Sequence, residues 1–190
     1  MKDYFNEICR SMTWLSEQND TMFIGQTVEY PGTALSNTVK HLPKEKLYEM
    51  PVCEDMQMGM AIGIAMNGSV PISIFPRWNF LLLGTNQIVS HLDKLKLMLP
   101  DNCNLPKIII RTSIGSINPL YPGPQHIGDF TDVFRLMCPN INVVRLDSTE
   151  MIFPSYKEAY ERQDGRSTLI VEWADAYDPV WCIKRAREIS

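Results

Sequence analysis

Short apolar runs rich in β-branched residues alternate along this chain with longer segments of helical period. Such alternation is typical of a parallel sheet whose strands are joined by helices packed on both faces. The sequence therefore predicts an α/β fold with three layers, α/β/α, and a central, mostly parallel sheet. Strands are expected at Thr21–Gly25, Leu47–Val52, Val70–Phe75, Lys107–Ser113, Asn142–Asp147 and Ser167–Trp173.

Helical periodicity is clearest before the first of these strands and after the third. Apolar residues recur at spacings of three and four at Phe5, Ile8, Met12 and Leu15, which predicts an amphipathic helix ahead of the sheet. The segment Asn79–Leu99 is the longest helix candidate.

A further helix is expected over residues 54–66. Between Met56 and Met66, Gln57 is the only polar side chain. A helix that is apolar all round has no face suited to water, so we expect this one to be surrounded by protein.

The length of the chain, 190 residues, allows one domain with a sizeable core. We expect a single domain over residues 1–190, with an N-terminal helix in 1–20, the core in 21–175 and a C-terminal tail in 176–190. The five cysteines are scattered and form no C-x-x-C pair, which argues against a disulfide framework and against a zinc site.

Composition and charge exclude several classes of partner. With 45% hydrophobic and 21% charged residues, the chain has the composition of a soluble globular protein. No apolar run reaches the roughly 20 residues that span a bilayer, and the first residues lack the apolar core of a secretory signal, so a cytoplasmic location is expected. The net charge is −4 and the basic residues do not cluster, so nucleic acid is not expected as a partner.

Two acidic residues, Glu54 and Asp55, open the segment of residues 54–66. Acidic residues in the first turn of a helix are stabilised by its unpaired amide groups and its dipole, which is a sufficient reason for many of them. A carboxylate at the entrance of a buried helix also suits proton transfer in a cleft. From the residues alone, both interpretations stay open.

The stretch PVCEDMQMGMAIGIAMNGSVPISIFPRWNF, residues 51–80, resembles the pyrimidine-binding half of thiamine diphosphate enzymes. The likeness is strongest to the beta subunits of the first components of 2-oxoacid dehydrogenases, of pyruvate and branched-chain type. It extends over roughly residues 23–172 through the elements TNQIVSHLDK, IIIRTSIG, PQHIGDF and CPNINVV. The positions that match the family pattern in the first stretch are Glu54, Gly59, Ala61, Gly63, Ala65, Gly68, Pro71, Asn79 and Phe80.

The resemblance implies thiamine diphosphate as cofactor and gives roles to four residues. Glu54 matches the glutamate that hydrogen-bonds a ring nitrogen of the aminopyrimidine and so activates the cofactor. Phe80 matches the aromatic residue that stacks on that ring, although plain core packing is an equally good interpretation. His126 matches a histidine that faces the substrate and assists proton transfer. Met56 stands close to the cofactor, where the family usually has glycine.

The resemblance also implies what this chain lacks. Enzymes of this type hold the cofactor diphosphate through Mg²⁺ bound by a Gly-Asp-Gly motif that ends in Asn-Asn, and the sequence contains no Gly-Asp-Gly. A partner subunit with that motif is therefore expected to hold the Mg²⁺, in an α2β2 heterotetramer with the active site at the interface. This chain itself is expected to provide no metal ligands.

The expected function is that of a beta-like subunit, active only with its partner, that decarboxylates a small 2-oxo acid or transfers the resulting acyl unit. The family's second, C-terminal domain is not part of the sequence, which favours a small decarboxylase or carboligase over a large dehydrogenase complex. Gln26 and Asn86 replace residues that are usually acidic in the family, so the substrate stays open. Alternatives are a split transketolase subunit that transfers a ketol unit, and a non-catalytic flavodoxin-like interaction module.

Overall fold

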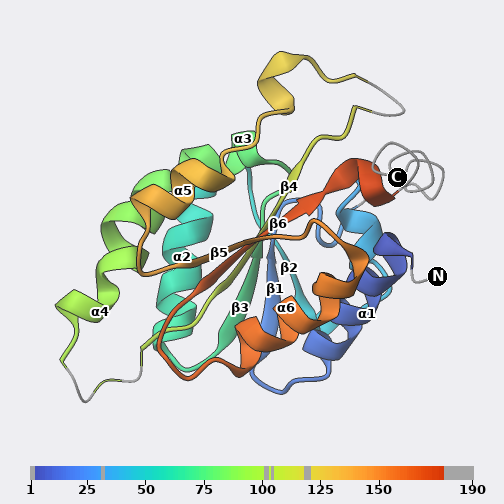
Figure 1. Cartoon of the computed structure of the whole chain (residues 1–190). Helices are drawn as coiled ribbons and strands as arrows, with labels where there is room; N and C mark the ends of the chain where they lie inside the picture. The colour runs from blue at the N-terminus through green and yellow to red at the C-terminus, as the bar shows by residue number, and fades with distance from the viewer. Residues whose placement is uncertain (1–2, 31–32, 101–102, 104, 118–120, 178–190) are drawn as a thin grey trace.

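The computed structural model describes residues 3–30, 33–100, 103, 105–117 and 121–177. Six strands form one sheet in the order β2-β1-β3-β4-β6-β5, and every neighbouring pair is parallel. The predicted three-layer α/β fold is therefore confirmed (Figure 1). The strands are β1 (Thr21–Gly25), β2 (Leu47–Glu49), β3 (Val70–Ile74), β4 (Ile109–Ile114), β5 (Asn142–Arg145) and β6 (Thr168–Trp173).

Helices and single helical turns connect these strands. The α-helices are α1 (Tyr4–Ser16), α2 (Glu54–Met66), α3 (Trp78–Leu81), α4 (Leu95–Met98), α5 (Thr131–Met137) and α6 (Thr149–Glu161). The turns are η1 (Ser36–Thr38), η2 (Lys44–Lys46), η3 (Leu82–Gly84), η4 (Gln87–His91), η5 (Leu92–Lys94), η6 (Pro124–His126) and η7 (Ala174–Tyr177). No helix within the described ranges is both long enough and apolar enough to cross a bilayer.

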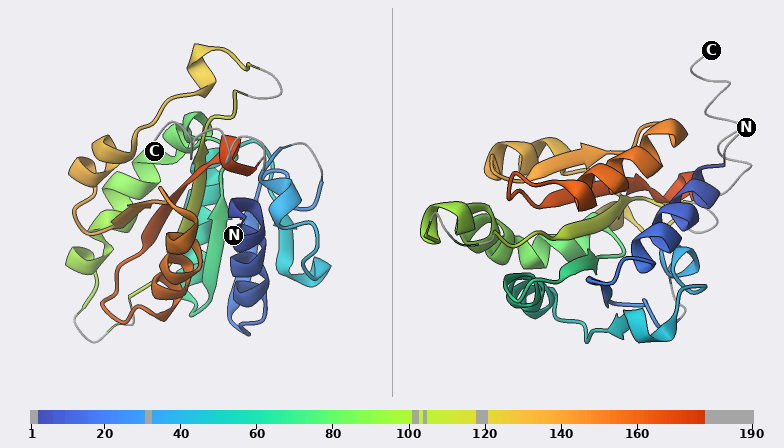
Figure 2. Two further views of the ribbon diagram at one scale, coloured as in Figure 1. Left: turned by 45° about the vertical axis from the view of Figure 1, so that its right-hand side comes forward. Right: turned by 90° about the horizontal axis from the view of Figure 1, so that it is seen from below.

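The helices form a layer on each face of the sheet. Helices α1 and α6 lie side by side on one face, and α2 to α5 cover the other (Figures 1 and 2). Side chains alternate along β4 between the two cores: Ile110 and Ile114 pack under α2 to α5, whereas Ile109 packs under α1 and α6. Burial on both faces explains why these strands are continuous apolar runs.

The long helix predicted at Asn79–Leu99 forms as a helical segment, but it is not one regular α-helix. The chain passes from α3 through the 3₁₀ turn η3, a π-helical turn at η4 and the 3₁₀ turn η5 into α4. Gly84 lies in this segment against the first turn of α2, where a Cβ atom would come within 3.3 Å of the backbone oxygen of Glu54. The irregular segment thus packs closely on the start of α2.

The expectation that α2 is surrounded by protein is wrong for this chain by itself. Met58 and Ala61 are buried against the sheet, but Met56, Met60 and Met66 on the opposite side are exposed. The apolar pattern of the helix was read correctly. The pattern does not say which side of the helix packs on the rest of the chain, and the side with Met56, Met60 and Met66 is not covered by the described residues.

A buried ion pair joins β4 to β6, and side chains from α6 and η7 contact it. Arg111 donates to both carboxylate oxygens of Glu172, at 2.5 and 2.9 Å, and both side chains are fully buried. The hydroxyls of Tyr156 and Tyr177 donate to the same carboxylate. Burial by itself would lower the pKa of Arg111, but Glu172 and the tyrosines raise it overall. Arg111 is therefore held as a cation inside the core.

Replacing Glu172 with glutamine should destabilise the fold strongly, because it leaves the Arg111 cation buried without a counter-charge. We expect Glu172→Gln to lower the free energy of unfolding by about 3–5 kcal/mol, measured by urea denaturation. The matched control is Glu150→Gln on the exposed side of α6, with a change within about 0.5 kcal/mol. Equal losses in the two variants would refute a special role for the pair.

Candidate functional site

The loops that leave the carboxyl ends of the strands share one edge of the sheet, because all strands run in the same direction. From β1 the chain moves outward to β2 and then returns past β1 to β3, so its direction reverses between β1 and β3. A crevice at such a reversal is the usual ligand site of open parallel sheets. Glu54 follows β2, Phe80 follows β3 and His126 follows β4, so all three belong to this edge.

Glu54 is the first residue of α2, and it is only 3% exposed. Its Oε1 atom accepts a hydrogen bond of 3.0 Å from Nε2 of Gln26. Its other carboxylate oxygen, Oε2, accepts no hydrogen bond from any described residue, yet it is not a fully buried polar atom. Gln26 thus fixes the carboxylate while leaving one oxygen able to accept or hold a proton.

Gln26 reaches Glu54 because β1 and β3 approach closely where β1 ends. Gly25, the last residue of β1, has φ +158°, and a Cβ atom there would lie 2.4 Å from the backbone oxygen of Ile74. Only glycine allows this approach. The next residue, Gln26, is consequently buried in the crevice between the two strands.

Phe80 and His126 form an aromatic pair beside the crevice. Their ring centroids are 5.8 Å apart with an angle of 43° between the planes. The Nδ1 atom of His126 and the Oδ1 atom of Asn79 are buried without a hydrogen-bond partner. The structure therefore brings Phe80 and His126 together, from α3 after β3 and from η6 after β4.

A pocket of about 510 Å³ opens at the same edge of the sheet. It is bounded by the segments that follow β1, β3, β4 and β6. Of the four residues expected in the site, Phe80 lines this pocket, whereas Glu54, Met56 and His126 do not. Met56 is 39% exposed on the outer side of α2. The pocket is lined by Thr33, Ala34, Leu35, Ser36, Asn37, Pro76, Arg77, Phe80, Gly115, Ser116 and Ala174.

Sequence reasoning missed two residues of this region. Gln26 was noted only as a departure from the family pattern, although its amide holds Glu54. Arg77 was not noted at all, although its Nη1 atom donates to the backbone oxygen of His126 at 3.1 Å. The signal for Arg77 was available, because a charged residue directly after an apolar strand of a parallel sheet falls at the ligand edge.

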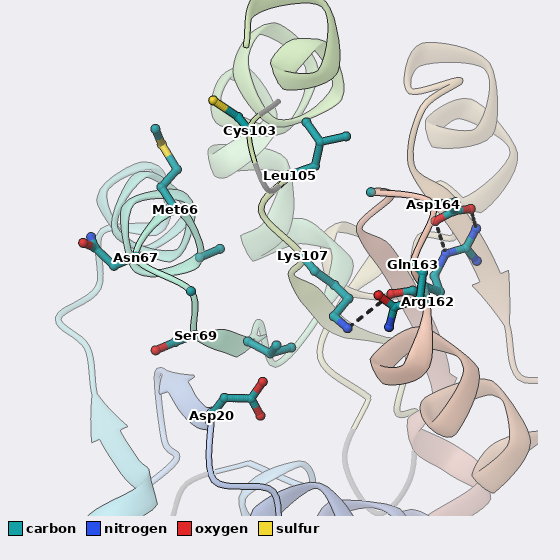
Figure 3. Close-up of a pocket in the computed structure, with 14 residues that line it drawn as sticks. Asp20, Met66, Asn67, Ser69, Cys103, Leu105, Lys107, Arg162, Gln163 and Asp164 are labelled. Atoms are coloured by element: carbon teal, nitrogen blue, oxygen red, sulfur yellow. Dashed lines mark hydrogen bonds and ion pairs between the residues drawn. The ribbon is translucent and has the colours of Figure 1, made fainter. Parts of the chain in front are cut away.

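A larger pocket, of about 880 Å³, lies at the opposite edge of the sheet, between the end of α2 and the turn from α6 to β6 (Figure 3). Its cations already have protein partners. Lys107 donates to the backbone oxygens of Tyr160 and Arg162, and Arg162 pairs with Glu158 and Asp164. Burial lowers the pKa of Lys107. Asp20, which also lines it, accepts a hydrogen bond from the Tyr160 hydroxyl. The pocket does not contain any predicted site residue.

The residues at the carboxyl edge fit one end of thiamine diphosphate. The open oxygen of Glu54 suits a ring nitrogen that shares a proton, and the half-buried face of Phe80 suits a flat heterocycle. Among the described residues, no three side chains of the kind that bind metals come together.

Removing the Gln26 amide should destabilise the crevice, because the buried Glu54 carboxylate loses its hydrogen-bond donor. We expect Gln26→Met to lower the free energy of unfolding by about 1–3 kcal/mol, measured by thermal and urea denaturation. Gln163→Met at the opposite edge replaces an exposed glutamine and serves as the matched control. A Gln26→Met protein as stable as this control would show that the hydrogen bond contributes nothing.

Residues 5–177 match the transketolase pyrimidine-binding domain family. The mitochondrial beta subunit of the pyruvate dehydrogenase E1 component from Ascaris suum is 31% identical over 139 residues, 73% of this chain and 34% of that protein. The beta subunit of 3-methyl-2-oxobutanoate dehydrogenase from Mycobacterium tuberculosis is 25% identical over 100 residues, 53% of this chain and 28% of that protein.

Among solved structures, a split gene transketolase, described as an inactive beta4 tetramer, has a TM-score of 0.64 at 16% identity. The match covers 90% of this chain and 51% of that one, and it shows a shared fold. The chain spans about a third or less of the curated relatives named above. The resemblance seen in the sequence is confirmed, and the chain belongs to the transketolase pyrimidine-binding domain family.

Proposed function

We propose that this chain is the pyrimidine-binding subunit of a heteromeric thiamine diphosphate enzyme that decarboxylates a 2-oxo acid, transfers the resulting acyl unit, or does both. The observation that carries this proposal is the carboxylate of Glu54, which is buried at the switch point of the sheet with one oxygen held by Gln26 and the other open. The relatives named as pyruvate and 3-methyl-2-oxobutanoate dehydrogenase subunits support a 2-oxo acid as the substrate.

Glu54 is the proton-holding residue of this mechanism. Thiamine diphosphate, when bound, supplies the carbon nucleophile and the electron sink that 2-oxo acid chemistry needs. With the cofactor bound, the Oε2 atom of Glu54 would hold the proton that is shared with the aminopyrimidine end, and the hydrogen bond from Gln26 to Oε1 restrains the carboxylate. Because Glu54 is only 3% exposed, a single well-placed carboxyl group is effective there.

Phe80, His126 and Met56 complete the proposed site. Phe80 provides a flat apolar wall for the heterocycle, and its ring is braced by the His126 ring at 5.8 Å. His126 moves protons on the substrate side, since an imidazole ring nitrogen can either donate or accept a proton. Met56, on the exposed side of α2, provides an apolar contact at the rim of the cleft.

A partner subunit with a Gly-Asp-Gly…Asn-Asn motif is proposed to hold the diphosphate and Mg²⁺. Large apolar side chains on the layer of α2 to α5 support a covering protein: Leu83, Leu97 and Leu136 are 63%, 76% and 85% exposed. An apolar surface of this kind marks an interaction site. We propose an α2β2 heterotetramer, in which this layer faces other subunits.

Glu54→Gln should abolish most of the turnover while the subunits still assemble, because glutamine fits the space but cannot exchange a proton. In the complex with the partner subunit, we expect kcat for pyruvate or 3-methyl-2-oxobutanoate to fall by about 100-fold or more, measured with an artificial electron acceptor. The control is Asp55→Asn, which removes a charge from the same helical turn at an exposed position.

Turnover by Glu54→Gln at the rate of the Asp55→Asn control would overturn the role of Glu54. Ketol transfer from a ketose phosphate, with no reaction of either 2-oxo acid, would favour a split transketolase instead, a possibility that the fold of the solved structure allows. Absence of ketol transfer and of turnover of any 2-oxo acid, 2-oxoglutarate included, in the wild-type complex would favour the non-catalytic interaction module.

Cofactor binding should require both subunits, because the residues found at the carboxyl edge fit only the pyrimidine end. Isothermal titration of thiamine diphosphate with Mg²⁺ should give saturable binding to the mixed subunits and no measurable binding to this chain alone. Omitting Mg²⁺ from the mixture should abolish binding as well. Equal affinity of the isolated chain and of the complex would contradict the proposed division of the site.

A further inference from the structure

Arg77 places a cation in the wall of the 510 Å³ pocket at the carboxyl edge of the sheet. Its Nη1 atom donates to the backbone oxygens of His126, at 3.1 Å, and of Ser116, at 3.5 Å. These hydrogen bonds hold one end of the guanidinium against the loop that follows β4. The orientation of the Arg77 guanidinium is therefore fixed by backbone oxygens of this loop and not by an acidic side chain.

The charge of Arg77 is not paired within the described part of the chain. No carboxylate there lies within ion-pair distance of it, and Asp175 acts on it only from farther away. Burial lowers the pKa of Arg77, and the negative charge of Asp175 offsets part of that effect. A half-buried cation without a close counter-ion is an unusual arrangement that an anionic ligand would complete.

The free donors of Arg77 have the geometry that oxyanions prefer. Its Nε and Nη2 atoms make no hydrogen bond to any described residue, and neither is a fully buried atom. This edge of a guanidinium presents two parallel N–H groups, which match the two oxygens of a carboxylate or phosphate. Arginine stays protonated at ordinary pH, so the group is suited to binding an anion and not to proton transfer.

The rest of the pocket wall is compatible with an anion. The side chains around Arg77 that line the pocket are neutral, and polar ones come from Thr33, Ser36, Asn37 and Ser116. No acidic residue is among the lining residues that the structure describes. Phe80 lines the same pocket and contacts His126, so this anion site adjoins the proposed reaction centre.

We propose that Arg77 binds an anionic group, a carboxylate or a phosphate, at the end of the substrate that does not react. This inference rests on the proposed function for the position of the reaction centre, and it narrows the substrate to a 2-oxo acid or acyl acceptor with a second acidic group. Simple 2-oxo acids with an apolar side chain would leave the Arg77 cation unpaired, so they should still be turned over but with a lower kcat/KM than acids with a second acidic group.

The kinetic test compares two substrates of the same chain length in the complex with the partner subunit. 2-Oxoglutarate has a distal carboxylate, and 2-oxopentanoate has a methyl group in its place. We expect kcat/KM to favour 2-oxoglutarate, and Arg77→Met to reduce that preference by about 10- to 100-fold with little effect on 2-oxopentanoate. Arg77→Lys should retain more of the preference than Arg77→Met does, because lysine keeps the positive charge but lacks the two parallel N–H donors of the guanidinium.

The matched control is Arg166→Met, which removes an exposed arginine at the opposite edge of the sheet and should leave both kcat/KM values unchanged. An equal fall in kcat/KM for both substrates in Arg77→Met would overturn the proposal. It would mean that Arg77 only positions the His126 loop, or that it binds the carboxylate that leaves as CO₂. A wild-type preference for 2-oxopentanoate would equally overturn the proposal.

A binding experiment on the full chain separates this inference from the proposed function, because it needs neither cofactor nor turnover. Glutarate and inorganic phosphate are titrated separately into the ¹⁵N-labelled chain, and the amide signals of Ser36, Phe80 and Gly115 are followed. Saturable shifts that vanish in Arg77→Met and persist in Arg166→Met are expected with one of the two anions, and which one responds identifies the group.

The two experiments fail in different ways. Binding of an anion at Arg77 without turnover of any 2-oxo acid would sink the proposed function and leave the anion site standing. Turnover of 2-oxo acids with no anion-dependent shift, and no loss of preference in Arg77→Met, would sink the anion site and leave the proposed function.

Discussion

The hydrogen bond from Gln26 to Glu54 joins the loop that leaves β1 to the helix that follows β2, at the point where the order of the sheet reverses. It is possible only because Gly25 lets β1 and β3 approach closely. The bond fixes one carboxylate oxygen and leaves the other open. The proton transfer proposed for Glu54 depends on that asymmetry, since a carboxylate bonded through both oxygens could not exchange a proton there.

In the proposed heterotetramer, the outer surface of α2 to α5 would face another subunit. Within the described residues this layer exposes methionines of α2 and leucines near α4 and α5, while the other face of the sheet is covered by α1 and α6. An exposed apolar surface of this kind marks an interaction site. The same layer includes the helix that begins at Glu54, so a subunit packed on it would also close the proposed cleft.

The pattern of apolar residues was enough to predict the fold. It also predicted that Glu54 and His126 lie at the carboxyl edge of the sheet. The β-branched runs predicted all six strands to within a few residues, because a strand buried on both faces is a continuous apolar run. The pattern could not predict that one side of α2 is exposed, since apolar periodicity does not say which molecule covers a face. It also missed the contact between Gln26 and Glu54, because that contact depends on segments from different strands meeting in space.

The most direct test of the account is a crystal structure of this chain with its diphosphate-binding partner, thiamine diphosphate and Mg²⁺. The account predicts that Oε2 of Glu54 lies at hydrogen-bond distance, about 2.6–3.0 Å, from a ring nitrogen of the aminopyrimidine, with the ring against Phe80. A cofactor bound at the other edge of the sheet, or a Glu54 side chain turned away from the ring, would contradict it.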